Sequence, residues 1–237
     1  MALIDKLKAI GDAIRSKLGT TQTYTLAEMP AAILSIQTGS GGTGGSLTDF
    51  LQGTATELVD NEAIWINPYK FHYDKTLTKV SGEKIESIGD HAFYYVETLT
   101  EINMPSLRDV SDSGLYRTSI TSITAPNMIT VGVNAFCGCK LLTKADFGKY
   151  QSRITEITFA DSAMQTCKLL DTVILRYKKV GYITGHPFWN TPIEPSDGSA
   201  PTGYIYVPAE LLSSYQNNWG VYAARFRAIE DYPDICG

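Results

Sequence analysis

The feature that most constrains this sequence is a repeat of apolar positions that begins at Ile66. Apolar residues stand in pairs five residues apart, and the first members of successive pairs lie 22, 22, 21, 28 and 24 residues from one another. At 43% hydrophobic residues overall, twelve apolar matches in twelve positions would arise by chance in roughly a few cases per 100,000. We therefore treat each interval as one structural unit, called a rung below. The pairs are Ile66/Phe71, Ile88/Phe93, Val110/Leu115, Val131/Phe136, Phe159/Met164 and Ile183/Phe188.

Further apolar columns follow each pair in the same order. The third column holds Leu77, Leu99, Ile120, Leu142, Leu170 and Ile193. The fourth holds Val80, Ile102, Ile123, Ala145, Val173 and Ile205, and a weaker fifth holds Met104, Ala125, Phe147, Leu175 and Val207. One such unit loses on the order of 30 kcal/mol of conformational entropy, whereas burial of its apolar side chains returns roughly 10 kcal/mol. A rung cannot fold alone, so stacked rungs must share a core that contains the second column.

The repeat also predicts the backbone. The third to fifth columns, as in "LTEINMP", give a short extended segment, which neighbouring rungs would pair into a parallel sheet along one side. The "IGDHAFYYV" part is expected to return the chain, with Ala or Gly where backbones crowd. The pattern I-x-x-x-A-F-x-x-C-x-x-L-x-x-I-x-(L/M)-P, as in "VGVNAFCGCKLLTKADF", resembles the BspA-like leucine-rich repeat. The resemblance implies an α+β solenoid of about six repeats over residues 47–207.

Residues 208–237 are expected to close the array as a C-terminal helical cap. Pro208 suits the first turn of a helix. Leu211, Leu212, Tyr215 and Trp219 then give that helix one apolar face for the open end of the stack.

Residues 1–36 predict a small helical hairpin. Apolar residues recur at helical spacing, and Thr25-Leu-Ala-Glu28 has the form of a capping box that opens a second helix. Gln37–Ser46 then reads as a flexible Gly/Ser linker. A hairpin of this length has too little core to be stable alone, so we expect it to dock on a partner or on copies of itself, for example as a trimer. The anchoring positions of the first helix are Leu3, Leu7, Ile10, Ile14 and Leu18.

The same 36 residues resemble a recurring N-terminal module of bacteriophage structural proteins. The resemblance implies attachment to other virion proteins. The N-terminus has no continuous apolar stretch for a signal peptide, and nowhere do 18 apolar residues follow one another. We therefore expect a protein made in the host cytoplasm and located on the virion, without membrane insertion.

Catalytic and metal-binding patterns are missing from the sequence. It has no G-x-S-x-G, P-loop, H-E-x-x-H or C-x-x-C, and a formal net charge of -5 argues against nucleic-acid binding. His91 and His186 occupy equivalent positions but would lie nearly 20 Å apart, at about 4.8 Å per stacked strand, which excludes a shared metal. Glu156 and Asp161 read as solvated charges. We expect no enzyme, no cofactor and no metal site.

Cys139 and Cys167 lie at equivalent positions of adjacent rungs. Such positions are within reach of a disulfide. The favoured interpretation is a pair of buried thiols that bond to local backbone groups, because a cytoplasmic origin disfavours disulfides.

A set of aromatic side chains outside the apolar columns forms the candidate recognition surface. Aromatic residues are favoured at protein interfaces and also suit the stacking of sugar rings. The alternative is that these residues merely flank the stack. The candidates are Tyr94, Tyr95, Tyr116, His186 and Trp189.

The leading functional hypothesis is a bacteriophage virion surface protein, in a tail fibre, baseplate or head fibre. Its N-terminal helices would attach it to the particle, and its repeats would adhere to a protein or glycan of the host surface. A purely structural capsid decoration or tail component is one alternative, and a bacterial repeat adhesin is another.

Overall fold

The computed structural model describes residues 56–149, 154 and 156–237. Contacts between residues divide the chain into two units, Met1–Val59 and Asp60–Gly237, and the second contains the repeats. The predicted second helix and the linker lie outside the described residues. So do the predicted anchoring positions Leu3, Leu7, Ile10, Ile14 and Leu18.

Short strands make up most of the regular structure. The strands are β1 (Glu57–Val59), β2 (Trp65–Ile66), β3 (Lys79–Ser81), β4 (Ser87–Ile88), β5 (Glu101–Asn103), β6 (Asp109–Val110), β7 (Ser122–Ala125), β8 (Thr130–Val131), β9 (Lys144–Phe147), β10 (Thr158–Phe159), β11 (Thr172–Leu175), β12 (Tyr182–Ile183), β13 (Tyr204–Val207) and β14 (Phe226–Ala228). The helical segments are η1 (Ala209–Leu211), α4 (Leu212–Asn218), η2 (Gly220–Arg225), η3 (Ile229–Asp231) and α5 (Pro233–Cys236).

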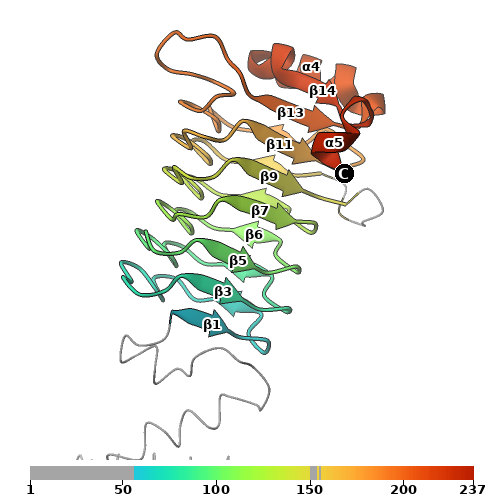
Figure 1. Ribbon diagram of the computed structural model, residues 1–237. Coiled ribbons are helices and arrows are strands. Elements are labelled where there is room, and N and C mark those ends of the chain that lie inside the picture. The colour runs from blue at the N-terminus through green and yellow to red at the C-terminus, as the bar shows by residue number, and fades with distance from the viewer. Residues whose placement is uncertain (1–55, 150–153, 155) are drawn as a thin grey trace, which may run out of the picture. The chain divides into compact units, whose positions relative to one another are not determined.

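The rungs stack into a solenoid with parallel sheets on two sides. The two-residue strands β2, β4, β6, β8, β10 and β12 form a six-stranded sheet in rung order. On the other side β3 pairs with β5, and β7, β9, β11, β13 and β14 form a five-stranded sheet. Figure 1 shows the longer strands lying one above another along the stack. The fold is therefore a parallel β-solenoid with few helices.

The pairing register follows the columns read from the sequence. In the six-stranded sheet each first-column residue is the direct partner of the next, beginning with Ile66 opposite Ile88 and Ile88 opposite Val110. The segment expected to return the chain thus also forms a second sheet, which the sequence did not predict. A two-residue strand is too short to show the alternation of apolar and polar residues by which strands are recognised.

The second column lies in the core. All six of its side chains are buried, and the rings of Phe71 and Phe93 stack with their centroids 5.3 Å apart. Backbone hydrogen bonds fix this spacing: Phe71 N–H donates to the Ala92 carbonyl at 2.9 Å, and Phe93 N–H donates to the Gly114 carbonyl at 2.8 Å. Ala or Gly precedes four of the six second-column residues and allows neighbouring backbones to approach closely there. The column consists of Phe71, Phe93, Leu115, Phe136, Met164 and Phe188.

The C-terminal segment closes the last rung. Tyr215 and Trp219 are buried as expected, and Trp219 Nε1 donates to the Gly181 carbonyl at 2.9 Å. Pro208 precedes η1 rather than starting α4. The cap also adds a strand that the helical pattern did not predict, because β14 extends the five-stranded sheet beyond β13.

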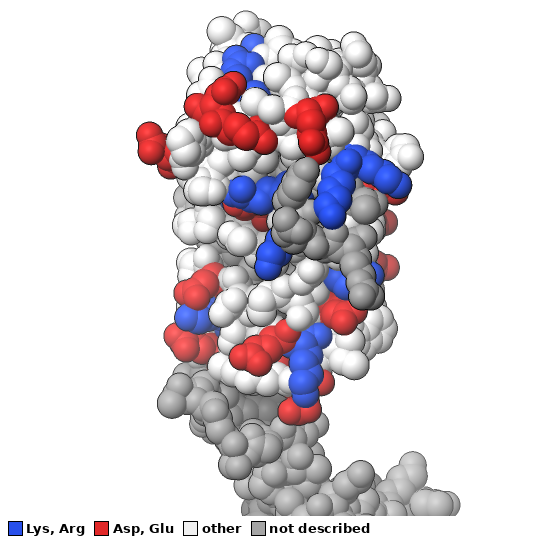
Figure 2. Space-filling view, turned by 90° about the vertical axis from the view of Figure 1, so that its right-hand side faces the viewer, with Lys and Arg blue, Asp and Glu red and all other residues white. Residues whose placement is uncertain are grey.

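Some charged side chains on the outside of the solenoid form ion pairs between neighbouring rungs. Lys84 lies 3.1 Å from Glu62, and Lys79 lies 2.8 Å from Glu101. Figure 2 shows acidic and basic side chains interspersed over one face of the molecule. Such exposed pairs contribute about 0–1 kcal/mol each, so this face gives little indication of a charged partner.

Candidate functional site: an aromatic surface on the first three rungs

Every rung turns its chain with two residues in the left-handed backbone conformation. These residues stand mostly three and seven positions after the start of the rung. In the last three rungs they are small or polar: Asn134 (φ 54°), Gly138 (φ 75°), Ser162 (φ 58°), Thr166 (φ 59°), Gly185 (φ 60°) and Asn190 (φ 63°). In the first three rungs most of them are large: Tyr69 (φ 58°), Tyr73 (φ 60°), His91 (φ 53°), Tyr95 (φ 57°), Ser113 (φ 56°) and Arg117 (φ 56°).

All six rungs share this turn conformation, but the side chains at its two left-handed positions differ between the first and the last three rungs. Tyr73 N–H donates to the Tyr94 carbonyl at 2.8 Å, and Gly138 N–H donates to the Gln165 carbonyl at 2.8 Å, so both halves use the same bonds. The left-handed conformation costs an L-residue roughly 1–2 kcal/mol, and Gly and Asn tolerate it best. The turn conformation therefore does not explain why tyrosine stands at these positions.

The large occupants and their neighbours form one continuous cluster, which we call the aromatic surface. Three pairs of rings stack across the rungs. Tyr69 and His91 lie 5.0 Å apart at 10°, and Tyr73 and Tyr95 lie 5.5 Å apart at 23°. The third pair, Tyr94 and Tyr116, lies 4.9 Å apart at 23°. The aromatic surface consists of Tyr69, His72, Tyr73, His91, Tyr94, Tyr95, Tyr116 and Arg117.

Stacking determines which parts of these rings reach solvent. Tyr69 and Tyr73 are 53% and 54% exposed, whereas Tyr94, Tyr95 and Tyr116 are half-buried. Each stacked contact covers one face of both of its rings, so the ring edges, the hydroxyl groups and the remaining faces are left for a partner. Loss of hydration raises the pKa of the Tyr94 hydroxyl above its usual value, and the neighbouring Tyr95 raises it further. Tyr94 therefore stays a protonated hydrogen-bond donor at neutral pH.

Arg117 ends the aromatic surface at its C-terminal side. Its guanidinium lies 5.0 Å from the centre of the Tyr95 ring and 5.8 Å from that of Tyr116, which are distances of a cation–π contact. A Cβ on Gly138 would lie 2.8 Å from Cγ of Arg117. The absent side chain of Gly138 therefore leaves room for the aliphatic part of Arg117.

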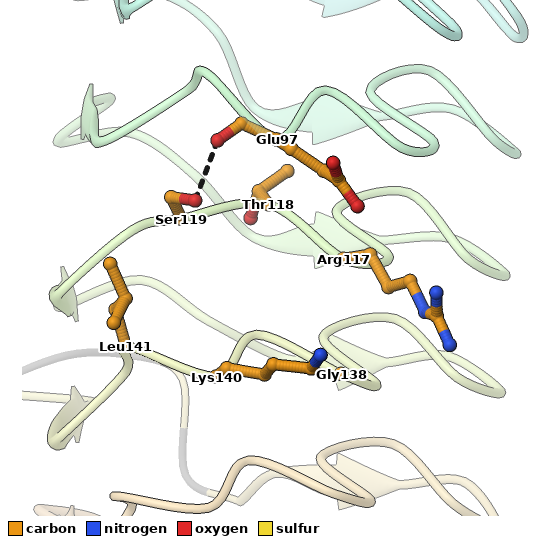
Figure 3. A pocket seen from close by; sticks show the side chains of 7 residues that line it. All are labelled: Glu97, Arg117, Thr118, Ser119, Gly138, Lys140 and Leu141. Carbon is orange, nitrogen blue, oxygen red and sulfur yellow. Dashed lines mark hydrogen bonds between the residues drawn. The ribbon is translucent and has the colours of Figure 1, made fainter.

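A groove adjoins this end of the aromatic surface. It has a volume of about 350 Å³ and crosses three successive rungs. In Figure 3 the side chains of Glu97, Arg117 and Lys140 point the same way, and Ser119 and Leu141 lie at the other end. Arg117 belongs to both the groove and the aromatic surface, so a single partner can contact both. The groove is lined by Glu97, Arg117, Thr118, Ser119, Gly138, Lys140 and Leu141.

The five predicted recognition residues fall into two separate clusters. Tyr94, Tyr95 and Tyr116 belong to the aromatic surface. His186 and Trp189 lie in the last rung and contact each other, with ring centres 5.9 Å apart.

The cluster of the last rung is bound to the C-terminal segment. His186 Nδ1 lies 2.5 Å from Glu194 Oε1, and the buried Tyr222 donates to Glu194 Oε2 at 2.6 Å. These bonds tie the last rung to η2. We therefore assign His186 to the closure of the solenoid and leave Trp189, at 40% exposure, outside the candidate site.

Sequence reasoning missed several members of the aromatic surface. Tyr69 and Tyr73 precede their partners in the next rung by 22 positions, so the repeat frame itself held the signal. From the sequence, His91 was considered as a metal ligand shared with His186 and excluded, but its ring lies against Tyr69 and its Nδ1 is buried without a hydrogen-bond partner. Arg117 was overlooked because charged residues between apolar columns usually lie in solvent.

The cysteines and the other chemical groups are accounted for without a further site. The thiols of Cys139 and Cys167 are free and buried, and they donate to the carbonyls of Leu115 and Phe136 at 3.1 Å each. This confirms the favoured interpretation. In the described part of the chain, no group of three His, Cys, Asp or Glu is placed to hold a metal ion. None of the helices described there is long and apolar enough to cross a membrane.

Comparison with known proteins identifies the repeat. Residues 65–194 match the BspA type leucine rich repeat region in six copies. Among solved structures, a leucine-rich repeat protein of T. pallidum is similar at 14% identity, with 54% of this chain and 73% of that chain covered and a TM-score of 0.40. No curated protein matches. Over more than half of its length, this chain thus belongs to the BspA-type leucine-rich repeat family.

Proposed function

We propose that this chain is a binding protein and not an enzyme, and that its aromatic surface contacts a partner protein. The observation that carries the proposal is the presence of tyrosines at left-handed backbone positions where the later rungs have Asn, Gly, Ser or Thr. Strained residues persist where the surrounding structure holds them, and they concentrate at functional sites.

The composition of the aromatic surface supports this proposal. Tyrosine and arginine are enriched among the residues that dominate protein–protein binding energies. Tyr69 and Tyr73 are more than half exposed. An exposed aromatic cluster of this kind marks an interaction site more often than an unused surface.

We further propose that the protein is located on a virion. The resemblance of residues 1–36 to a phage structural module favours a virion, whereas a bacterial repeat adhesin would present the same aromatic surface. A chain that lacks residues 1–46 tests this proposal, because it should keep its repeats folded and fail to join particles. Incorporation of the shortened chain would contradict the anchor and favour the adhesin.

Binding to intact cells tests the aromatic surface. Labelled full-length protein is titrated onto intact bacterial cells. These are cells of the phage host for a virion protein, or of the bacterium that encodes the gene for an adhesin. The double variant Tyr94→Ser/Tyr116→Ser should bind at least about tenfold more weakly, because it removes one stacked pair at the centre of the surface.

The matched control is Tyr182→Ser, a 62% exposed tyrosine on the last rung. It should bind like the unmodified chain, and thermal unfolding should show that both variants remain folded. Equal binding by all three proteins would contradict the proposal. No binding by any of them at micromolar concentration would favour a purely structural component.

A further inference from the structure

We propose that the groove beside the aromatic surface takes a carboxylate-rich segment of the partner protein. This inference rests on the proposed function, because it names the chemistry of the partner at the same site. Its basis is an excess of hydrogen-bond donors and cationic groups over acceptors, on a surface where stacking covers one face of each paired ring.

The hydroxyl groups of Tyr94 and Tyr95 differ from those of the buried Tyr177 and Tyr222. In the buried set, Tyr177 donates to the Met128 carbonyl at 2.7 Å, and Tyr222 donates to Glu194 at 2.6 Å. Among the described residues, the hydroxyls of Tyr94 and Tyr95 have no such partner. They are therefore available to donate to acceptor groups of a ligand.

The charged residues of the groove favour an anion. Arg117 and Lys140 line it together with one carboxylate, that of Glu97. Lys140 is exposed and forms no ion pair with any of the described residues. Among the described residues Glu97 forms an ion pair with neither cation, so two cationic groups and a single carboxylate line the groove.

The ring edges and hydroxyl groups favour an acidic peptide over a glycan. Sugar rings bind aromatic side chains by lying on their faces, and each of the three stacked contacts covers one face of both of its rings, which leaves fewer faces open to a sugar. Exposed ring edges carry partial positive charge, which attracts carboxylate oxygens. Donors, ring edges and Lys140 thus converge on the same ligand chemistry.

The size of the groove fits side chains rather than a large ligand. Its volume of about 350 Å³ is near the lower end of ligand pockets, which span about 300–1,000 Å³. Leu141, at 46% exposure, adds an apolar contact at the end opposite the charged groups. One or two acidic side chains would occupy the groove while their backbone crosses the aromatic surface.

Synthetic peptides test the charge preference directly. The probes are a fluorescent peptide of alternating Glu and Ser, the same peptide with Gln in place of Glu, and one with Lys in place of Glu. Fluorescence polarisation with the full chain should show the Glu peptide binding at least about tenfold more tightly than the Gln peptide at low salt. The advantage should shrink at about 0.5 M salt, where screening shortens electrostatic reach. Equal binding of the Glu and Gln peptides would overturn the inference.

A pair of lysine variants locates the effect. Lys140 and Lys168 both stand nine residues after the start of a rung, but Lys168 is outside the groove and donates to Asn190. Lys140→Glu should weaken binding of the Glu peptide about tenfold, whereas Lys168→Glu should change it little. Equal losses would indicate attraction by overall charge and would contradict a site in the groove.

The two proposals fail in distinguishable ways. If Tyr94→Ser/Tyr116→Ser abolishes cell binding while the peptides show no charge preference, the binding function stands and the acidic ligand is wrong. If neither the tyrosine nor the lysine variants change binding, both proposals are wrong. Binding of an oligosaccharide that depends on Tyr94 and Tyr116 would replace the acidic segment with a glycan.

Discussion

The first three and the last three rungs share one backbone and differ in what they display. Both halves place two residues per rung in the left-handed conformation and bond them to the next rung. The later half fills these positions with Asn, Gly, Ser and Thr, which suit the turn, whereas the earlier half has three tyrosines, a histidine and an arginine among its six. The fold requires the left-handed backbone conformation at these positions and not an aromatic ring. The aromatic surface is therefore a feature added to the solenoid.

The tyrosines of the two halves show the same contrast. Tyr177 and the cap residue Tyr215 are buried, and each has a hydrogen-bonded hydroxyl. Tyr94 and Tyr95 lie at the surface without such bonds in the described part of the chain. Tyr177 and Tyr215 therefore stabilise the stack, whereas Tyr94 and Tyr95 are available to a partner.

Truncation of the shared core should have the largest effect and should be alike in both halves. Phe93→Ala and Phe136→Ala each remove a fully buried ring, so each should lower the free energy of unfolding by about 3–5 kcal/mol. Urea denaturation followed by circular dichroism measures both. The exposed Tyr182→Ala is the control, with an expected change within about 0.5 kcal/mol. A much smaller loss in one half would show that the halves do not share one core.

Alkaline pH should weaken the C-terminal closure. Burial raises the pKa of Tyr215 from 10.0 to about 12. Between these values the folded state holds a proton that the unfolded state releases. The contribution of Tyr215 to stability is therefore complete below pH 10 and falls by roughly 1.4 kcal/mol per pH unit towards pH 12. Burial also raises the pKa of Tyr177 and of Tyr222, which add to this decline. Trp219, whose ring centre lies 5.4 Å from that of Tyr215, reports the loss by its fluorescence.

The control for this pH dependence is Tyr215→Phe. It should lower stability at neutral pH by about 1 kcal/mol, because the bond to the Lys179 carbonyl is lost. It should also flatten the decline above pH 10. An unchanged slope in this variant would assign the decline to other groups.

Relief of backbone strain should have the smallest effect on stability. It should make substitution of Tyr95 less destabilising than substitution of Tyr116. Both Tyr95→Asn and Tyr116→Asn remove a stacked ring, but only Tyr95 has a positive φ. Asn accepts that conformation readily, so the loss of stability should be about 1 kcal/mol smaller for Tyr95→Asn. Thermal unfolding of the two variants measures the difference. Equal losses would show that the tyrosines carry no strain, and would weaken the argument for their functional role.

Much of the fold was readable from the periodicity of apolar residues. The first column gave the register of the six-stranded sheet, since Val110 pairs with Val131 and Val131 pairs with Phe159 as the rung spacing requires. The apolar pattern did not predict that the six-stranded sheet exists. Its strands are two residues long, and parallel pairing between rungs leaves no mark within one rung.

The candidate site was readable only in part. Tyr94, Tyr95 and Tyr116 were found because they stand outside the apolar columns. Grouping them with His186 and Trp189 treated residues of distant rungs as one surface, although side chains cluster only with those of adjacent rungs. Tyr69 and Tyr73 were missed because an isolated rung does not show which ring stacks on which.

The amino-acid pattern alone specified the spacing of the six repeats and the side chains that enter their core, because burial of apolar area recurs wherever the chain returns to the same face. The tertiary structure decided the second sheet, the left-handed turns and the groove at Arg117. These features depend on how the backbone of one rung meets that of the next. Two tyrosines 22 residues apart become a stacked pair only when hydrogen bonds hold their rungs in register, and no local pattern of the chain encodes that contact.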